Sequence, residues 1–214
     1  AQQMLTPAGQ LLTLQEAARR VQVGLTAWSG LADKPELLSE TLALIDECKS
    51  CMIEPEMLFR ASEESALDED AALSAKLRDL AQILTQYDSL CEETLPDPRD
   101  RLTHLRDGLA ESHVLDGAEV YLDGFLSYTP QELAIIEVML SSGVPLTAAV
   151  TCDVELPDVF VTGCRTLRTL TRMAERCSRR PELVDLGAGK MPRPAGLAAV
   201  ANEALLPVRQ AHED

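Results

Sequence analysis

The chain has 214 residues, a formal net charge of −16 and 46% hydrophobic residues. This apolar content is enough for a packed core, so the composition excludes a largely disordered chain. No apolar run approaches the roughly 20 residues that cross a bilayer, and no signal-peptide pattern begins the sequence. We therefore expect a soluble, cytoplasmic protein with no membrane contact. Aromatic residues make up only 3%, so Leu and Ala must fill the core, which favours helices.

Charge is distributed unevenly along the sequence. Residues 1–159 contain 10 Lys+Arg and 29 Asp+Glu, a net charge of −19, whereas residues 160–214 contain 9 and 6, a net charge of +3. Six arginines lie between Cys164 and Arg180, and Glu175 is the one acid among them. The overall acidity argues against a nucleic-acid binder, because phosphate contacts need Lys and Arg. The arginine-rich segment is either a solvated helix face that pairs with the acidic body, or a helix that contacts phosphates or a partner.

Cysteine and histidine spacing gives little sign of a metal site. Cys48 and Cys51 form a lone Cys-x-x-Cys, but no second pair follows, and the three histidines lack zinc-ligand spacing. We expect free thiols of a reducing compartment and no metal bound through cysteine.

The first half of the sequence predicts a series of helices. Apolar residues recur at three- and four-residue steps, and prolines or glycines lie near the helix ends. Five acids within residues 61–70 predict an exposed loop, since their order lacks the spacing and central Gly of a calcium loop. The predicted helices cover residues 10–30, 35–51, 54–59, 71–93 and 99–112.

The spacing of apolar residues along the sequence changes after residue 113. A buried strand is predicted over 118–122, followed by a helix from Pro130 to Ser142 and a second strand over 146–152. Thr129 and Glu132 have the spacing of a capping box at the start of this helix.

Asp123 and Asp153 come directly after the two predicted strands. A strand–helix–strand unit has parallel strands, so both aspartates lie at the same carboxyl edge of the sheet, where ligands bind. Two carboxylates at this edge suit a metal–phosphate site. They also occur as ordinary turn residues, and the sequence leaves both interpretations open.

Three segments follow from this pattern. Residues 1–115 form a helical subdomain, residues 116–160 a β-α-β core, and residues 161–214 a basic helix with a tail rich in Gly, Pro and Ala. Within the last segment a helix is predicted over 166–177, and a short helical pattern lies near 198–206.

The segment around Asp123 resembles a known family. Superfamily I helicases place Asp-Glu at the end of this strand, whereas this chain has Asp123-Gly124-Phe125, followed by Thr129-Pro130-Gln131-Glu132. That form is similar to the AddB subunit of the AddAB-type helicase-nuclease. The stretches 44–56, 75–87 and 160–176 support the same resemblance.

The resemblance implies a fold, an activity and partners. The fold is a predominantly helical α/β fragment of a P-loop-NTPase-like helicase core, with a short parallel β-α-β unit and a large helical insertion. AddB pairs with a motor-and-nuclease subunit, AddA, to resect DNA double-strand breaks for recombinational repair. The family uses ATP, magnesium and an iron–sulfur cluster. No complete G-x-x-x-x-G-K-[ST] loop is present, so these groups are expected outside this segment.

The resemblance also assigns roles to single residues. Asp123, with Asp153 nearby, is the remnant of the magnesium-holding acid, and Gly124 replaces the catalytic base. Gln131 and Glu132 stand where the motor family couples nucleotide state to DNA. The residues implied in DNA or partner contact are Arg165, Arg168, Arg172 and Arg176.

Two functions remain at this stage. The first is a non-hydrolysing, helicase-like segment of a DNA-repair nuclease subunit that supports DNA holding, scanning and subunit assembly. The alternative is a free-standing acidic helical scaffold that binds a protein partner. On that alternative Asp123 caps its own turn, while Gln131 and Glu132 only begin a helix.

Overall fold

The computed structural model describes residues 3–68, 70–153 and 157–186. Two compact units make up the chain. We call residues 1–120 and 128–146 the helical unit, and residues 121–127 and 147–214 the arginine-helix unit. The predicted boundaries at residues 115 and 160 differ from these limits and stay a prediction.

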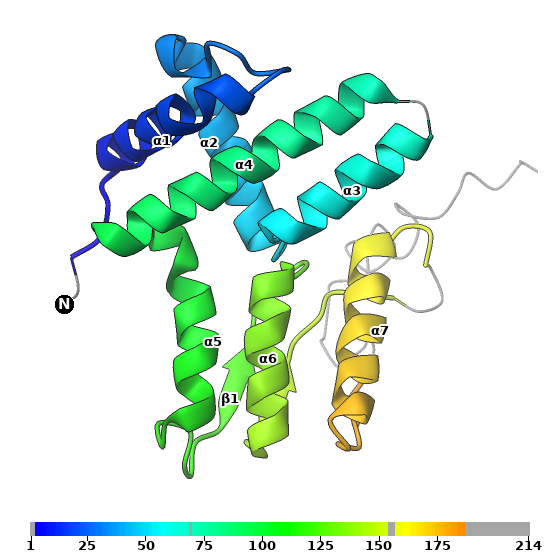
Figure 1. The fold of residues 1–214 in the computed structure, drawn as a ribbon. Helices are drawn as coiled ribbons and strands as arrows, with labels where there is room; N and C mark the ends of the chain where they lie inside the picture. Colours follow the sequence, from blue (N-terminus) through cyan, green and yellow to red (C-terminus); the bar gives the residue numbers. More distant parts are fainter. Residues whose placement is uncertain (1–2, 69, 154–156, 187–214) are drawn as a thin grey trace, which may run out of the picture. The chain divides into compact units, whose positions relative to one another are not determined.

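Helices dominate the helical unit (Figure 1). The predicted amphipathic pattern explains them, because each buries one stripe of apolar side chains against its neighbours. The α3 and α4 helices lie side by side, and α1 packs against α4. The bounds are α1 (Pro7–Val21), α2 (Pro35–Ser50), α3 (Pro55–Leu67), α4 (Ala71–Glu93), α5 (Arg101–Glu111) and α6 (Pro130–Ser142), with 3₁₀ turns at Gln22–Gly24, Leu31–Asp33 and Pro98–Asp100.

The core of this unit lies between the first four helices. Leu14 of α1, Ile45 of α2 and Ile83 of α4 are fully buried, and Leu58 of α3 is nearly so. The one fully buried aromatic side chain of the described core, Tyr87 of α4, lies in the same cluster. Leu, Ile and Ala therefore supply most of the core, as the composition predicts.

The first helix ends earlier than predicted. Its pattern was expected to continue through residues 10–30, but α1 ends at Val21. The buried carboxylate of Asp79 explains the difference, because its Oδ2 accepts the backbone N–H groups of Thr26, Ala27 and Trp28 at 2.7–2.9 Å. Those N–H groups are held by a side chain from α4, so this stretch forms a loop instead of continuing the helix.

The acidic stretch was also predicted incorrectly. A helix ending at Phe59 and a loop over 61–70 were expected, yet α3 continues to Leu67. Its residues Leu58 and Ser62 are buried, and α3 packs along α4, so contact with the longer helix holds this acidic segment helical. The long helix over 71–93 is confirmed, and Asp70 caps it by accepting the N–H of Leu73 at 3.0 Å.

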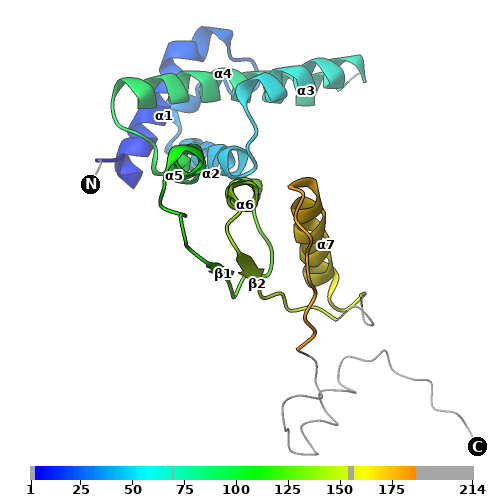
Figure 2. The same ribbon diagram turned by 90° about the horizontal axis from the view of Figure 1, so that it is seen from below.

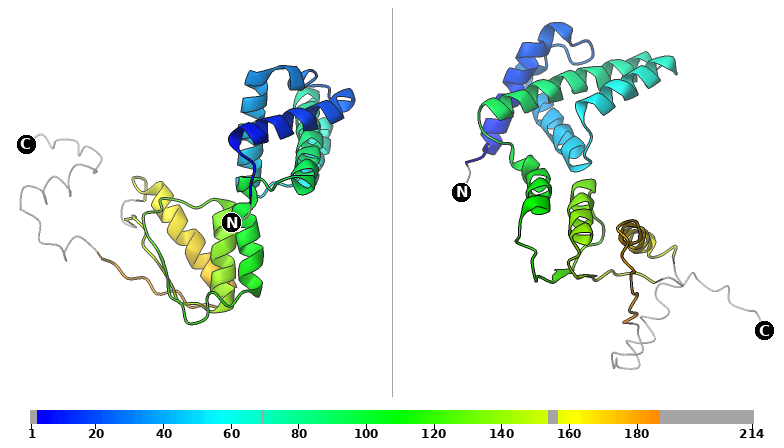
Figure 3. Two further views of the ribbon diagram at one scale, coloured as in Figure 1. Left: turned by 90° about the vertical axis from the view of Figure 1, so that its left-hand side faces the viewer. Right: turned by 60° about the horizontal axis from the view of Figure 1, so that its bottom comes forward.

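The α5 and α6 helices lie next to each other (Figure 3). The predicted capping box at the start of α6 is confirmed, since Thr129 accepts the N–H of Glu132, and the Glu132 side chain accepts the N–H of Thr129. The predicted end at Ser142 is confirmed as well. Gly143 follows with φ of 90°, a left-handed conformation that favours glycine.

Two short strands, β1 (Val120–Leu122) and β2 (Leu146–Ala148), pair in a two-stranded sheet (Figure 2). Val120 N–H donates to the Pro145 carbonyl and Ala149 N–H to the Leu122 carbonyl, so the strands are parallel as predicted. The expected burial of the first strand was wrong, because Tyr121 is 69% exposed. Within the described residues the sheet is limited to these two strands of three residues, so a larger P-loop-like core stays a prediction.

The arginine-helix unit contains α7 (Val161–Arg176), which begins five residues earlier than predicted. The helical pattern expected near 198–206 lies outside the described residues. In the part of the chain that the structure describes, no helix combines the length and apolar character of a membrane span.

Candidate functional site

Asp123 lies exposed at the end of β1. Its carboxylate Oδ1 accepts the backbone N–H of Gly124 at 2.8 Å. Gly124 has φ of 80°, and a Cβ at this position would meet no atom within 4 Å. The turn thus needs glycine for its backbone conformation, and the Asp123 carboxylate stabilises it by capping.

Asp153 follows β2 and is half-buried. Its backbone carbonyl accepts a hydrogen bond from the Cys164 thiol of α7 at 3.4 Å. The second strand was predicted over 146–152, but β2 ends at Ala148, so Asp153 lies five residues beyond the strand, whereas Asp123 directly follows β1. The two strands are parallel, but only Asp123 lies at a strand end, and a shared ion-binding role for the two aspartates stays a prediction.

The residues at this edge fit a magnesium ion only in part. Magnesium beside a nucleotide takes one or two protein carboxylates, and phosphates and waters complete its coordination. Asp123 supplies one carboxylate, but Gly124 offers no side-chain oxygen. Among the described residues no group of three or more His, Cys, Asp or Glu side chains is arranged to hold a metal ion. Any ion at this edge would therefore depend on ligands from a nucleotide.

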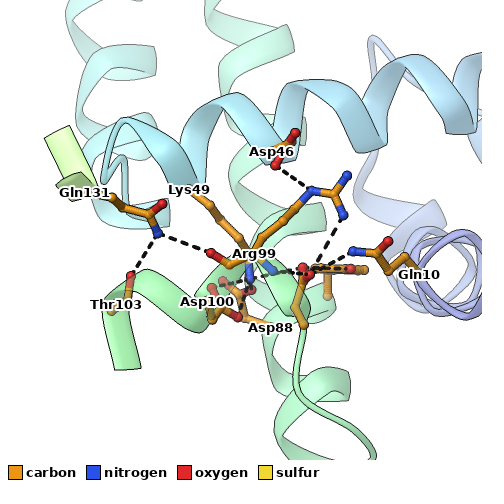
Figure 4. Close-up of polar contacts among 10 residues, drawn as sticks. Gln10, Asp46, Lys49, Asp88, Arg99, Asp100, Thr103 and Gln131 are labelled. Carbon is orange, nitrogen blue, oxygen red and sulfur yellow. Dashed lines mark hydrogen bonds and ion pairs between the residues drawn. The ribbon is translucent and has the colours of Figure 1, made fainter. Parts of the chain in front are cut away.

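Gln131, in the first turn of α6, is buried (Figure 4). Its amide Nε2 donates to the Thr103 hydroxyl at 3.0 Å and to the Arg99 carbonyl at 3.3 Å. These bonds join the start of α6 to the start of α5. Glu132, in contrast, is engaged in the capping box. Both observed arrangements are structural, so a coupling role for the pair stays a prediction.

A buried polar cluster around Lys49 and Arg99 lies next to the Gln131 contact (Figure 4). Asp97, which is 1% exposed, accepts several of its hydrogen bonds. The Asp97 carboxylate accepts hydrogen bonds from Gln10 Nε2 at 2.8 Å, Tyr87 OH at 2.9 Å and the Arg99 N–H at 3.0 Å. Burial alone would raise its pKa, but these donors and the Lys49 charge hold the pKa of Asp97 below its ordinary value. The carboxylate is therefore charged and hydrogen-bonded in the interior.

Lys49 of α2 is the cation of this cluster. Its Nζ lies 2.8 Å from both Asp88 and Asp100, and 3.5 Å from Asp97. Burial disfavours the charged amine, yet the facing carboxylates raise the pKa of Lys49 above its ordinary value. Arg99 belongs to the same cluster, and its Nε forms an ion pair with Asp46 Oδ1 at 2.6 Å. The cluster fixes the Pro98–Asp100 turn, and with it the start of α5, against the four-helix core.

Sequence reasoning missed this cluster. Asp97 stands between two prolines that end the helical pattern over 71–93, and nothing in the sequence marks it for burial. Lys49 lies near the end of the predicted helix over 35–51, where a lysine usually faces solvent, so the sequence gives no sign of its burial.

The start of α7 is anchored to the segments that follow both strands. A Cβ on Gly163 would lie 2.1 Å from the Thr151 carbonyl oxygen, so the helix approaches that backbone closely. The Thr166 hydroxyl donates to the Leu126 carbonyl at 2.9 Å. These contacts fix the helix to both segments within its own unit.

All four predicted arginines of α7 are exposed, and Gly163, Cys164, Thr166, Met173 and Ala174 are buried. The structure brings Arg165, Arg168 and Arg172 onto one face of the helix. In the described residues these three form no ion pair, and Arg168 donates only to the Cys164 carbonyl of its own helix at 3.2 Å.

Comparison with known proteins identifies relatives over most of the chain. The family model described as "ADDB, N-terminal" matches residues 1–191. The B subunit of the ATP-dependent helicase/deoxyribonuclease of Symbiobacterium thermophilum is 34% identical over 140 residues, which are 64% of this chain and 12% of that protein. The corresponding protein of Acetivibrio thermocellus is 30% identical over 173 residues, 78% of this chain and 15% of that protein. That of Alkaliphilus oremlandii is 26% identical over 188 residues, 86% of this chain and 16% of that protein.

The chain spans 12% to 16% of the length of these three relatives. The resemblance that the 119–132 segment indicated is confirmed by the match, which includes the helical unit and the other unit as far as residue 191. The chain belongs to the AddB N-terminal family.

Proposed function

We propose that the chain is a non-hydrolysing, helicase-like segment of a subunit that repairs DNA double-strand breaks as part of a helicase/exonuclease. In this role it supports DNA holding or scanning and subunit assembly. The observation that carries the proposal is the family match over residues 1–191 together with Gly124 directly after Asp123. The relatives named as helicase/deoxyribonuclease subunits agree with it.

The chemistry of the strand end supports the non-hydrolysing part. A hydrolysing motor needs a residue that orients or deprotonates the attacking water beside the magnesium-holding acid. Gly124 occupies that position without a side chain, and Asp123 Oδ1 already binds the Gly124 N–H. The strand end is therefore suited to hold a nucleotide-bound ion at most, and Gly124 offers no group to activate water there.

The partners follow from the same proposal. An AddA-like motor-nuclease subunit would supply ATP hydrolysis, and DNA would be bound in the assembled complex. ATP, magnesium and an iron–sulfur cluster would act outside this segment. The alternative of a free-standing acidic scaffold is less well supported, because the net charge of −16 and the Leu-rich amphipathic helices that allow it are equally compatible with a subunit domain.

The test uses the full-length subunit without its partner and compares it with an Asp123→Asn variant. Asn keeps an oxygen that can accept the Gly124 N–H, so the turn is preserved while the negative charge is lost. We expect ATP hydrolysis in the presence of DNA to stay at background for both proteins. Turnover by the unmodified subunit that Asp123→Asn abolishes would overturn the proposal, since the acid would then be part of a working motor site.

A further inference from the structure

The arginines of α7 form a narrow stripe along one side of the helix. At about 100° per residue, Arg165, Arg168, Arg172 and Arg176 fall within an arc of about 80°. All four are exposed, while Met173 and the other buried residues of α7 lie outside this arc. Successive arginines are three or four residues apart, which is a rise of roughly 4.5–6 Å along the helix axis.

This placement is unfavourable for an isolated helix. Arg168, Arg172 and Arg176 stand at four-residue steps, and like charges at this spacing repel. Arg165, Arg168 and Arg172 find no acidic partner among the described residues. In the helical unit, by contrast, Lys49 and Arg99 each meet acids at 2.6–2.8 Å. The stripe is thus a local excess of positive charge on a strongly acidic chain.

The stripe is also held rigidly. Gly163 lies against the Thr151 carbonyl, Thr166 bonds to Leu126, and Cys164 bonds to Asp153. These anchors reach the segments after both strands of the unit. The arginines therefore project from a fixed helix, and less conformational entropy is lost when they bind a ligand.

We propose that this stripe binds the phosphate backbone of DNA and does not read the bases. The inference rests on the proposed function. Arginine pairs with phosphate through a planar fork of N–H donors, and a row of arginines along one helix face suits successive phosphates. The α7 sequence contains no Asn, Gln or aromatic side chain, which are frequent base-reading and base-stacking groups.

A protein partner fits this surface less well. Protein interfaces are built around apolar or aromatic anchors with a polar rim. On the arginine side of α7 the one exposed large apolar residue is Val161, at the start of the helix. The surface offers charge without an apolar centre, which is the character of a backbone-binding surface.

The test uses the assembled complex of the full-length subunit and its partner. Arg165, Arg168 and Arg172 are replaced together by Ala, and affinity for a labelled DNA duplex is measured over a range of salt concentrations. We expect the slope of log affinity against log salt to become shallower by about 2 to 3, because each lost phosphate contact removes about 0.9 from the slope. The loss should be equal for duplexes of unrelated sequence, and replacement by Lys should retain most of the affinity.

The matched control replaces three exposed arginines of the helical unit, Arg19, Arg60 and Arg101, by Ala, which changes the net charge equally. An unchanged slope in the α7 variant, or a slope that changes equally in the control, would overturn the inference. Release of the partner subunit with DNA affinity retained would also overturn it, by making α7 a protein-binding surface. If the unmodified complex binds no DNA, the proposed function fails as a whole, so the two failures are distinguishable.

Discussion

The amide Nε2 of Gln131 donates a hydrogen bond to the Thr103 hydroxyl at 3.0 Å, although 28 positions separate the two residues. The same amide donates to the Arg99 carbonyl. Arg99 lies in the turn that Lys49 and Asp46 hold against the four-helix core. Gln131 therefore links the helix after β1 to the buried polar cluster.

Replacing Gln131 by Leu should loosen this link. The Thr103 hydroxyl and the Arg99 carbonyl would lose a buried donor, at a cost of about 1–3 kcal/mol. Hydrogen exchange of the α5 and α6 amides in the 214-residue chain would measure the lower opening free energy. Thr103→Val should give part of this effect, and the double variant should lose less than the sum of the two. Exchange rates equal to those of the unmodified chain would contradict a structural role for Gln131.

Acid should destabilise the chain partly through Asp97. Its folded-state pKa lies below the ordinary value, so the unfolded chain takes up the proton first as the pH falls. The stabilisation is complete at neutral pH and is lost as the pH falls below about 4 towards the folded-state pKa. We expect the free energy of unfolding of Asp97→Asn to be lower at neutral pH and to change less on acidification. Urea unfolding followed by the fluorescence of Trp28, the sole tryptophan, measures both.

Asp88 provides the control of opposite sign. Burial raises the pKa of Asp88 even though Lys49 opposes the shift. The folded chain then takes up this proton first, so Asp88 adds stability as the pH falls. In the Asp88→Asn variant the free energy of unfolding should consequently fall more steeply on acidification. Equal pH profiles for the Asp97 and Asp88 variants would contradict the opposite pKa shifts of the two carboxyls.

A methyl group at Gly163 should displace α7, since its Cβ would lie 2.1 Å from the Thr151 carbonyl oxygen. Overpacking of this kind costs about 1–3 kcal/mol, and faster hydrogen exchange across α7 would report it. Gly108→Ala is the matched control, because Gly108 lies within α5 and a Cβ there meets no atom within 4 Å. That variant should gain about 0.5–1 kcal/mol from the better helix propensity of Ala. Equal effects at the two glycines would refute the close approach of α7 to the loop after β2.

Adding a carboxylate at Gly124 should not create ATP hydrolysis in the 214-residue chain, because its sequence holds no complete G-x-x-x-x-G-K-[ST] phosphate loop. Gly124 has open space around it, but its φ of 80° makes any L side chain costly by about 1–2 kcal/mol. Steady-state phosphate release by the 214-residue Gly124→Glu chain should equal that of Gly124→Asn, in which Asn tolerates the same backbone conformation without an acid. Turnover in the Glu variant alone would show that the missing base is the one defect of the site.

Several parts of the fold were predictable from the sequence because they depend on neighbours in the chain. The capping box of Thr129 and Glu132 is an interaction across three positions, and the left-handed Gly143 ends the same helix. The bounds of α4 follow from the Asp70 cap and a regular apolar period. The parallel pairing of β1 and β2 follows from the order strand, helix, strand.

The errors lie where distant residues decide the local structure. The chain after Val21 leaves its helical pattern because Asp79, more than fifty positions later, holds the N–H groups of Thr26 and Trp28. The acidic segment around Glu63 stays helical because α3 packs along α4. Neither effect has a signal within the segment itself.

The sequence by itself determined the helical character, the parallel strand pair, the family and the arginine stripe, since each depends on composition, period or a local motif. The tertiary structure alone decided which polar residues are buried. Gln10 and Asp97 are 87 positions apart, and Asp97 keeps its charge in the interior because Gln10, Tyr87 and the Arg99 N–H donate to it and the Lys49 charge lies nearby. A buried charge is stable only when every partner is in place, and folding is the step that brings those partners together.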